Sequence, residues 1–531
     1  MENQFADEPL EQQPDTDKEY YVSPITKSKG LTHLMKLILC AKDNDKCLEM
    51  IKEIIKDDPD KVNDKCEKGW TALSIACRNC STYSNIGVVE ILSNHPNIDI
   101  NSRNNGGFTA LMLACRNSNN DYNVGTVKLL LNHPDIDVNG HDNNGWTALM
   151  LACRCSNKYS SVETIKLLLN RSDIDINKCD SGGWTSLMVA CRYSSTDSNV
   201  ETVKLLLNRS DIDVNKQKTD GWTALIMACR YSSTDSNVET VKLLLDQSDI
   251  DVNKEETDGW TALIMACRYS STDSNVETVK LLLNRSDIDV NKQNNDGHTA
   301  LIMACRHSDN DSNIETVKLL LNHPDMDVNK CNNDGLTALM FACRYSNTKS
   351  NMKTVELLLD YSNIDIYKKN YNGKHTVAYI CDDNDATEIF IEYVSNNNVY
   401  IDRDMVRLIL EKNISYFDQL FQMIYNPLNF DRKVIAKILE KHDDTDDIIH
   451  YCNLHNNIKK RVLKDIPNHK EELYYKPNNI ISLCSEVNFK LKFKTDRQVF
   501  EELDDKLKFI FDIKNESDMI NKVSFYLCDD M

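Results

Sequence analysis

The chain of 531 residues contains nineteen cysteines and twelve histidines, side chains that can bind metals or act as nucleophiles. Four of them lie close together in sequence, at His442, His450, Cys452 and His455, but their spacing matches no zinc motif. Scattered surface histidines explain this cluster better than a metal site does. The sequence also contains no Gly-rich phosphate loop and no Gly-x-Ser-x-Gly or His-Glu-x-x-His motif. We therefore expect a non-enzymatic protein with no cofactor and no metal.

The cysteines follow a regular spacing that argues against disulfide chemistry. Nine of them recur at steps of 38 residues, at Cys77, Cys115, Cys153, Cys191, Cys229, Cys267, Cys305, Cys343 and Cys381. Such a column indicates a repeated unit in which each cysteine is a small buried apolar residue. Packed helices lie about 8–10 Å apart, too far for disulfides between equivalent positions. Reduced thiols in an intracellular protein, with the cytoplasm as the expected location, are the simplest interpretation.

Three further columns contain the residue types that most often dominate binding energy. One column holds an aromatic residue directly after a glycine, one holds arginine, and one holds tyrosine directly after that arginine. The aromatic column consists of Trp70, Phe108, Trp146, Trp184, Trp222 and Trp260. The arginine column runs from Arg78 to Arg344 in steps of 38 and includes Arg192, Arg230 and Arg268. The tyrosines that follow these three arginines are Tyr193, Tyr231 and Tyr269.

These columns belong to units of 38 residues, and the unit that begins at Gly221 shows the expected local structure. Asp220-Gly221 is typical of a tight turn, with a positive φ at the glycine. Thr223 suits an N-cap for a short helix over residues 224–231. Ser236 and Glu239 form a capping box for a second helix with an apolar stripe at helical spacing. Residues 249–253 then form an extended, strand-like segment that leads to the next turn.

A unit of this size cannot bury its own apolar stripe and must stack on its neighbours. The phrase Thr-Ala-Leu-(Met/Ile)-x-Ala, as in residues 261–266, resembles the ankyrin repeat, although the usual Pro and His of the Thr-Pro-Leu-His signature are absent. The 38-residue units, in a chain rich in Asn, Asp, Lys and Ile, look like the multi-ankyrin proteins of giant amoeba-infecting DNA viruses. The resemblance implies an all-α ankyrin-repeat solenoid of about ten helix-turn-helix units with a helical C-terminal extension.

The resemblance also implies a protein-protein interaction scaffold that binds an unidentified protein, with a host protein as a candidate, in a concave groove. The aromatic, arginine and tyrosine columns would then form ladders along that groove. Packing between units is the alternative, because a residue repeated in every unit can equally serve the stack. In that case each arginine bonds to a neighbouring Asp or to the C-terminal carbonyls of its own helix, and each tryptophan stacks on the adjacent turn. Specificity is expected at the turn tips, which differ between units.

The segments outside the repeats are interpreted from composition. Residues 1–22 contain seven acidic residues before Tyr20 and are expected to form a disordered tail. Residues 23–396 are assigned to the solenoid, with clean copies over 69–372, and residues 397–531 to a helical cap or extension. Residues 503–511 and 518–523 are weakly similar to an F-box, without its Leu-Pro start. The alternative function is therefore a ubiquitin-ligase substrate receptor that recruits a Skp-type adaptor.

Charge and hydropathy exclude other classes of partner. Acidic residues outnumber basic ones 82 to 62, giving a net charge of −20, which disfavours attraction to nucleic acid or to an anionic membrane surface. No apolar run approaches the roughly 20 residues that span a bilayer. The N-terminus has no apolar core of a signal peptide. We expect a soluble intracellular protein, acting in the host cell if the chain is viral.

Overall fold

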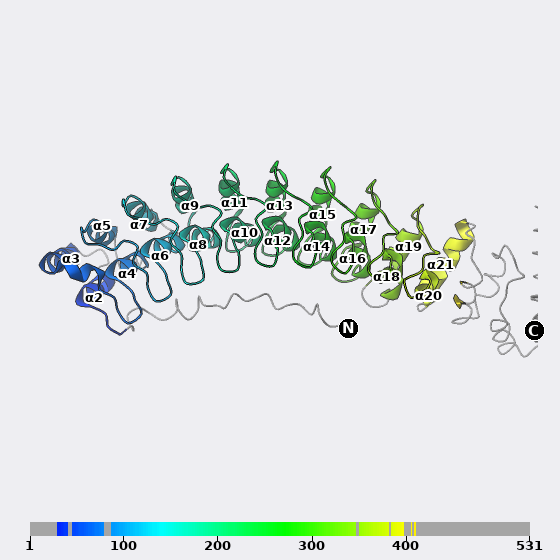
Figure 1. Cartoon of the computed structure of the whole chain (residues 1–531), viewed down its shortest axis with the longest axis horizontal. Coiled ribbons are helices and arrows are strands. Elements are labelled where there is room, and N and C mark those ends of the chain that lie inside the picture. Colours follow the sequence, from blue (N-terminus) through cyan, green and yellow to red (C-terminus); the bar gives the residue numbers. More distant parts are fainter. Residues whose placement is uncertain are drawn as a thin grey trace, which may run out of the picture. The chain divides into compact units, whose positions relative to one another are not determined.

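Figure 1 shows the computed structural model of the chain. The structure describes residues 29–40, 45–78, 86–119, 121–346, 350–381 and 384–397, together with Met405, Leu408 and Ile409. In this part of the chain the regular elements are α-helices and one short 3-10 helix, η2, over Pro59–Asn63. β-structure is confined there to isolated bridges at the turns between repeats, such as Glu255 with Thr261.

The helices alternate between two kinds, because each repeat contributes a first and a second helix. The chain divides into two compact units, residues 1–295 and residues 296–531, and each is described by itself. In the first unit the first helices are α2 (His33–Cys40), α4 (Ala72–Arg78), α6 (Ala110–Arg116), α8 (Ala148–Cys155), α10 (Ser186–Arg192), α12 (Ala224–Arg230) and α14 (Ala262–Arg268). The second helices are α3 (Asp45–Asp57), α5 (Ile86–Ser93), α7 (Asp121–Leu131), α9 (Val162–Leu169), α11 (Val200–Leu207), α13 (Val238–Leu245) and α15 (Val276–Leu283).

The second unit contains three more pairs. Its first helices are α16 (Ala300–Arg306), α18 (Ala338–Arg344) and α20 (Thr376–Ile380), and its second helices are α17 (Ile314–Leu321), α19 (Met352–Leu359) and α21 (Asn384–Asn397). Within each unit the first helices form one layer and the second helices form another (Figure 1). The described residues therefore contain ten helix pairs, as the sequence repeat predicts.

The start of each first helix follows the sequence prediction. Gly221 has a φ of 86°, and the other turn glycines of the repeats also have positive φ. The side chain of Thr223 accepts a hydrogen bond from the Ile226 backbone N–H at 3.2 Å and caps α12. A hydroxyl at this position satisfies one of the free donors of the first turn. Tyr231 is the C-cap, so α12 ends one residue before the predicted limit.

The start of the second helix differs from the sequence prediction. The N-cap of α13 is Asn237, whose side chain accepts from the Thr240 backbone N–H at 2.9 Å. The predicted capping box of Ser236 and Glu239 is therefore wrong by one residue. The Ser236 hydroxyl instead lies 3.2 Å from that of Ser194 in the preceding repeat, in a buried row of hydroxyl groups. Residues 249–253 also form no strand, since Asp249, Val252 and Asn253 lie in turns.

The core lies between the two layers and between successive repeats. Ala228, Cys229, Val241 and Leu244 are all fully buried. Burial of this kind removes apolar surface from water at about 25 cal/mol per Å², and it is possible only because each repeat covers the next. Burial also raises the pKa of the Cys229 thiol well above its usual value, so this side chain stays protonated and apolar.

Several sequence predictions fall outside the described residues. They concern the acidic tail over residues 1–22, nearly all of the helical extension over residues 397–531, the cluster from His442 to His455, and the F-box-like segments over residues 503–511 and 518–523. These remain predictions. No helix among the described residues has the length and apolar character needed to cross a membrane.

Candidate partner-binding surface

The aromatic column lies at the base of the turn that precedes each first helix. Trp70, Trp146 and Trp260 are buried, whereas Phe108, Trp184 and Trp222 are half-buried and keep part of their rings exposed. The backbone N–H of Trp184 donates to Asp180 Oδ1 at 2.8 Å, which fixes the residue in the turn. The column is thus partly a packing element and partly a surface.

Buried acceptors hold these turns. Asp142, Asp180 and Glu256 each accept two backbone N–H groups of their own turn through one carboxylate oxygen. Asn104 and Asn332 make the same contacts with an amide oxygen. Desolvation raises the pKa of the carboxyl groups of Asp142, Asp180 and Glu256, although the hydrogen bonds that they accept oppose this shift.

The arginine column is held by the following repeat. The side chain of Arg192 forms an ion pair with Asp235, and its guanidinium carbon lies 3.4 Å from the centre of the Tyr231 ring. The next repeat shows the same arrangement, in which Arg230 pairs with Asp273 and lies 3.3 Å from the centre of the Tyr269 ring. One of the two packing alternatives for this column, an arginine bonded to a neighbouring Asp, is therefore present at these arginines.

The arrangement is looser one repeat earlier. Arg154 Nη2 lies 3.6 Å from Asp197 Oδ2, and the guanidinium carbon lies 4.2 Å from the centre of the Tyr193 ring. Lys158 also contacts the same carboxylate. Three successive arginines of the first unit thus combine a charge pair with a cation-π contact, and both fix the orientation of the tyrosine ring.

Residues of the three columns contact one another. The rings of Trp222 and Tyr231 stack with their centres 6.5 Å apart. The guanidinium carbon of Arg268 lies 5.7 Å from the centre of the Trp260 ring and 4.7 Å from that of Tyr269. We name this region the aromatic–arginine surface and define it by Trp184, Trp222, Tyr193, Tyr231, Tyr269, Arg192, Arg230 and Arg268. All of its residues belong to the first unit.

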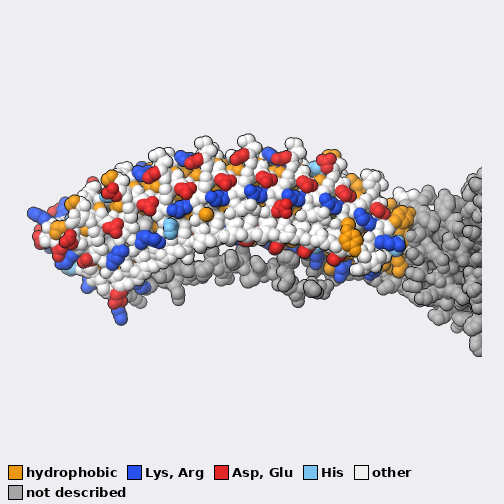
Figure 2. Space-filling view, in the orientation of Figure 1, with side chains coloured by type: hydrophobic (Ala, Val, Ile, Leu, Met, Phe, Trp, Pro, Cys, Tyr) orange, Lys and Arg blue, Asp and Glu red, His pale blue; other side chains and the backbone are white. Residues whose placement is uncertain are grey.

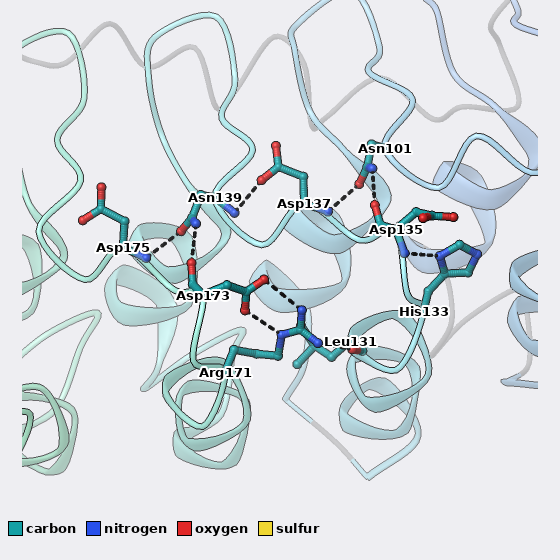
Figure 3. A network of polar contacts seen from close by, with 9 residues as sticks. All are labelled: Asn101, Leu131, His133, Asp135, Asp137, Asn139, Arg171, Asp173 and Asp175. Carbon is teal, nitrogen blue, oxygen red and sulfur yellow. Dashed lines mark hydrogen bonds and ion pairs between the residues drawn. The ribbon is translucent and has the colours of Figure 1, made fainter.

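A further repeated contact, an asparagine ladder that was not among the sequence predictions, lies in the loops after the second helices (Figure 3). Asn139 Nδ2 donates to the Asp173 carbonyl at 2.7 Å, and Asn139 Oδ1 accepts from the Asp175 backbone N–H at 2.8 Å. Each asparagine thus binds both a donor and an acceptor of the next repeat. The signal in the sequence is a column of asparagines at steps of 38, at Asn63, Asn101, Asn139, Asn177, Asn215, Asn253, Asn291 and Asn329.

Comparison with known families agrees with this architecture. A family profile described as ankyrin repeats (3 copies) matches residues 37–139, 119–218, 195–294 and 272–370, which together cover more than half of the chain. The chain belongs to the ankyrin-repeat family. The predicted all-α ankyrin-repeat solenoid is confirmed. Its repeat of 38 residues is longer than the usual ankyrin unit of 33.

A relative of these ankyrin repeats is found in a giant virus. Over 80 residues the chain is 39% identical to ankyrin repeat protein L88 of Acanthamoeba polyphaga mimivirus. The match covers 15% of this chain and 9% of the length of that protein. The predicted likeness to multi-ankyrin proteins of amoeba-infecting viruses is therefore confirmed.

The loops after the second helices, which contain the asparagine ladder, also contain a second kind of contact between ankyrin repeats. In three repeats the second helix is followed by Arg-Ser-Asp, and Arg171 forms two hydrogen bonds of 2.9 Å with Asp173 while donating to the Leu131 carbonyl of the previous repeat at 3.0 Å (Figure 3). Hydrogen bonds from Arg171 hold the pKa of the Asp173 carboxyl below its ordinary value. Other repeats have His-Pro-Asp, and His133 Nδ1 accepts from the Asp135 backbone N–H at 3.2 Å. Figure 2 shows acidic and basic side chains close together along this face of the first unit.

The turn tips of the ankyrin repeats, where specificity was predicted, are also joined to each other. The Thr257 backbone N–H donates to the Asp220 carbonyl at 2.9 Å, and Gln217 Nε2 donates to the Glu255 carbonyl at 2.8 Å. These contacts fix the tips relative to one another. Among the described residues no group of His, Cys, Asp and Glu has the arrangement of a metal site.

Proposed function

We propose that the first unit binds a protein partner through the aromatic–arginine surface. Ankyrin repeats are generally protein-protein interaction modules, and their family is typically non-enzymatic. The observation that carries the proposal is the set of half-buried rings of Trp184, Trp222, Tyr193, Tyr231 and Tyr269, which lie in three successive repeats.

The composition and rigidity of this surface support the proposal. Trp, Tyr and Arg are the residues most often found at the energetic centre of protein interfaces. The tyrosine rings are fixed by guanidinium groups at 3.3–4.2 Å, and Asp235 and Asp273 hold the guanidinium groups in turn. A partner would therefore meet side chains that are already ordered, which reduces the entropy lost on binding.

The test places a photo-crosslinking amino acid at Tyr231 in the full-length chain. The matched control carries it at Lys242, an exposed residue of α13 in the same repeat. In cells that produce the protein, we expect a discrete crosslinked partner from position 231 that is absent from position 242. Equal crosslinking at both positions, or none at either, contradicts the proposal.

A second experiment separates binding from packing. Trp222→Ala and Trp184→Ala remove rings that are already half-exposed, and thermal unfolding followed by circular dichroism monitors the stack. Loss of the crosslinked partner with an unchanged unfolding temperature supports binding. An unchanged crosslink in folded variants shows that the tryptophan column only packs.

A further inference from the structure

The arginine column continues into the second unit, where the residues that pair with it in the first unit are missing from the sequence. Each paired arginine of the first unit contacts an Asp that lies 43 residues later in the sequence, as Arg192 does with Asp235 and Arg230 with Asp273. The same step from Arg306 leads to Lys349, and from Arg344 it leads to Thr387. Thr387 is uncharged and buried, with its hydroxyl donating to the Ile380 carbonyl at 3.2 Å.

Neither Arg306 nor Arg344 therefore has a carboxylate within ion-pair distance among the residues that the structure describes. Within the second unit, the carboxylate of Asp311 instead lies 3.5 Å from Nδ1 of the buried His307. The Nε atom of Arg306 is buried and has no hydrogen-bond acceptor in the described structure. Arg344 is exposed to solvent.

Both guanidinium groups lie beside a rigid aromatic platform. The rings of Phe341 and Tyr345 are stacked at 6.2 Å with an interplanar angle of 9°. The guanidinium carbon of Arg306 lies 5.0 Å from the centre of the Tyr345 ring, compared with 3.3 Å and 3.4 Å at the paired arginines of the first unit. That of Arg344 lies 5.4 Å from the same ring. Two guanidinium groups thus lie beside the same Tyr345 ring, and neither has a carboxylate partner among the described residues.

We propose that Arg306 and Arg344 bind an acidic segment of a protein partner, with one carboxylate at each arginine. Neighbouring helices such as α16 and α18 pack about 8–10 Å apart. A polyproline II segment rises about 3.1 Å per residue and returns to the same face every third residue, so its residues i and i+3 are about 9 Å apart. The segment that fits carries Glu or Asp at these two positions. This site lies in the second unit and does not depend on the aromatic–arginine surface.

The experiment measures binding of a dye-labelled peptide with a Glu-Pro-Pro-Glu core to the full-length chain by fluorescence anisotropy at low salt. We expect saturable binding that weakens about tenfold with Arg306→Gln and about tenfold with Arg344→Gln, since each removes charge-assisted hydrogen bonds. A peptide with Gln-Pro-Pro-Gln is expected to lose binding, and one with adjacent glutamates is expected to bind more weakly. Arg154→Gln is the matched control, because its guanidinium already has Asp197 as a counter-charge.

The proposal is overturned if no peptide binds saturably, or if folded Arg306→Gln and Arg344→Gln variants bind as tightly as the parent. It is also overturned if Arg154→Gln weakens binding to the same extent. Lys349→Asp restores the residue that the preceding repeats have at this step, and it is expected to weaken binding more than Lys349→Gln does. Deletion of residues 1–22 should leave the affinity unchanged. A clear increase in affinity for the peptide would mean that the acidic tail of this chain occupies the site, which contradicts the binding of an external partner.

Discussion

The asparagine ladder and the arginine column repeat with the same 38-residue step but depend on their neighbours in different ways. Asn177 and Asn215 both bond to a carbonyl and an N–H group of the next repeat, at 2.6–2.8 Å. Arg192 pairs with an Asp side chain of the next repeat, whereas the sequence has Lys349 at the corresponding position after Arg306. Any residue provides the backbone groups that the asparagine needs, whereas the Asp side chain that the arginine needs can be replaced in any repeat. Repetition alone therefore does not distinguish a structural column from a binding one.

The greatest loss of stability is expected at the turn tips, where the backbones of neighbouring repeats are in contact. A Cβ atom at Gly221, where φ is 86°, would lie 2.7 Å from Glu256 Cα and 2.8 Å from Thr257 N. We expect Gly221→Ala to lower the free energy of unfolding by about 2–4 kcal/mol, measured by urea denaturation. Gly373→Ala is the control, because φ is 75° but no described atom lies within 4 Å of the added Cβ atom. Strain alone should cost about 1 kcal/mol there, and equal losses would contradict this account.

The second prediction concerns the arginine column and its ion pairs. Arg192, with a side chain only 5% exposed, loses both its pair with Asp235 and its stacking on Tyr231 in the Arg192→Gln variant. We expect a loss of about 2 kcal/mol, less than for a fully buried pair because the Asp235 side chain is 35% exposed. The same substitution at Arg344 should cost no more than about 0.5 kcal/mol. A double-mutant cycle with Asp235→Asn checks that the coupling is specific to the pair.

These differences show which parts of the molecule the sequence predicts. The turn glycines and the Thr223 cap depend on their own local residues, and both were correctly predicted. Ser236 was misassigned as a cap because its hydroxyl is bonded to Ser194, 42 residues earlier, and no local pattern reports that bond. The prediction that the tryptophan, arginine and tyrosine columns share one surface rests on the resemblance to the ankyrin repeat. Their binding role stays a prediction.

The pairing of the arginines could in part have been predicted. Asp197, Asp235, Asp273 and Asp311 recur at steps of 38, and this series ends at Lys349. The geometry that joins each Asp to the arginine of the preceding repeat is a property of the stack, however, and it requires the distance between neighbouring loops. The asparagine ladder has the same origin, since its partners are backbone groups that every sequence contains.

Loss of an asparagine of the ladder is expected to lower stability less than loss of Arg192 does. Asn215→Ala removes two hydrogen bonds at a solvent-exposed loop, and we expect a loss of about 1–2 kcal/mol in urea denaturation. Asn177→Ala should cost the same within about 0.5 kcal/mol, because both side chains bond to backbone. Asn215→Asp keeps the acceptor for the Asp251 N–H but loses the donor to the Asp249 carbonyl. It should therefore retain part of the stability, and full retention would show that the donor bond is unimportant.

The smallest effect concerns the buried acceptors of the turns and the sign of their pH dependence. Desolvation raises the pKa of the Asp142 carboxyl in the folded state, so this group takes up its proton at a higher pH than in the unfolded chain. Its ionisation therefore opposes folding at neutral pH, and this penalty is relieved as pH falls through the folded pKa. Asp142→Asn should change stability at pH 7 by less than about 1 kcal/mol, since Asn104 and Asn332 fill the same role, and it should remove this pH dependence.

Asp211 provides the opposite case, because hydrogen bonds from Arg209 lower its pKa. Its contribution to stability is present above the pKa of the unfolded chain and is lost as pH falls through the lower folded value. Urea denaturation of both Asp→Asn variants between pH 7 and pH 3 should therefore show opposite trends relative to the parent. The same sign in both would mean that the carboxylate of Asp142 is held by its two N–H donors more strongly than it is destabilised by burial.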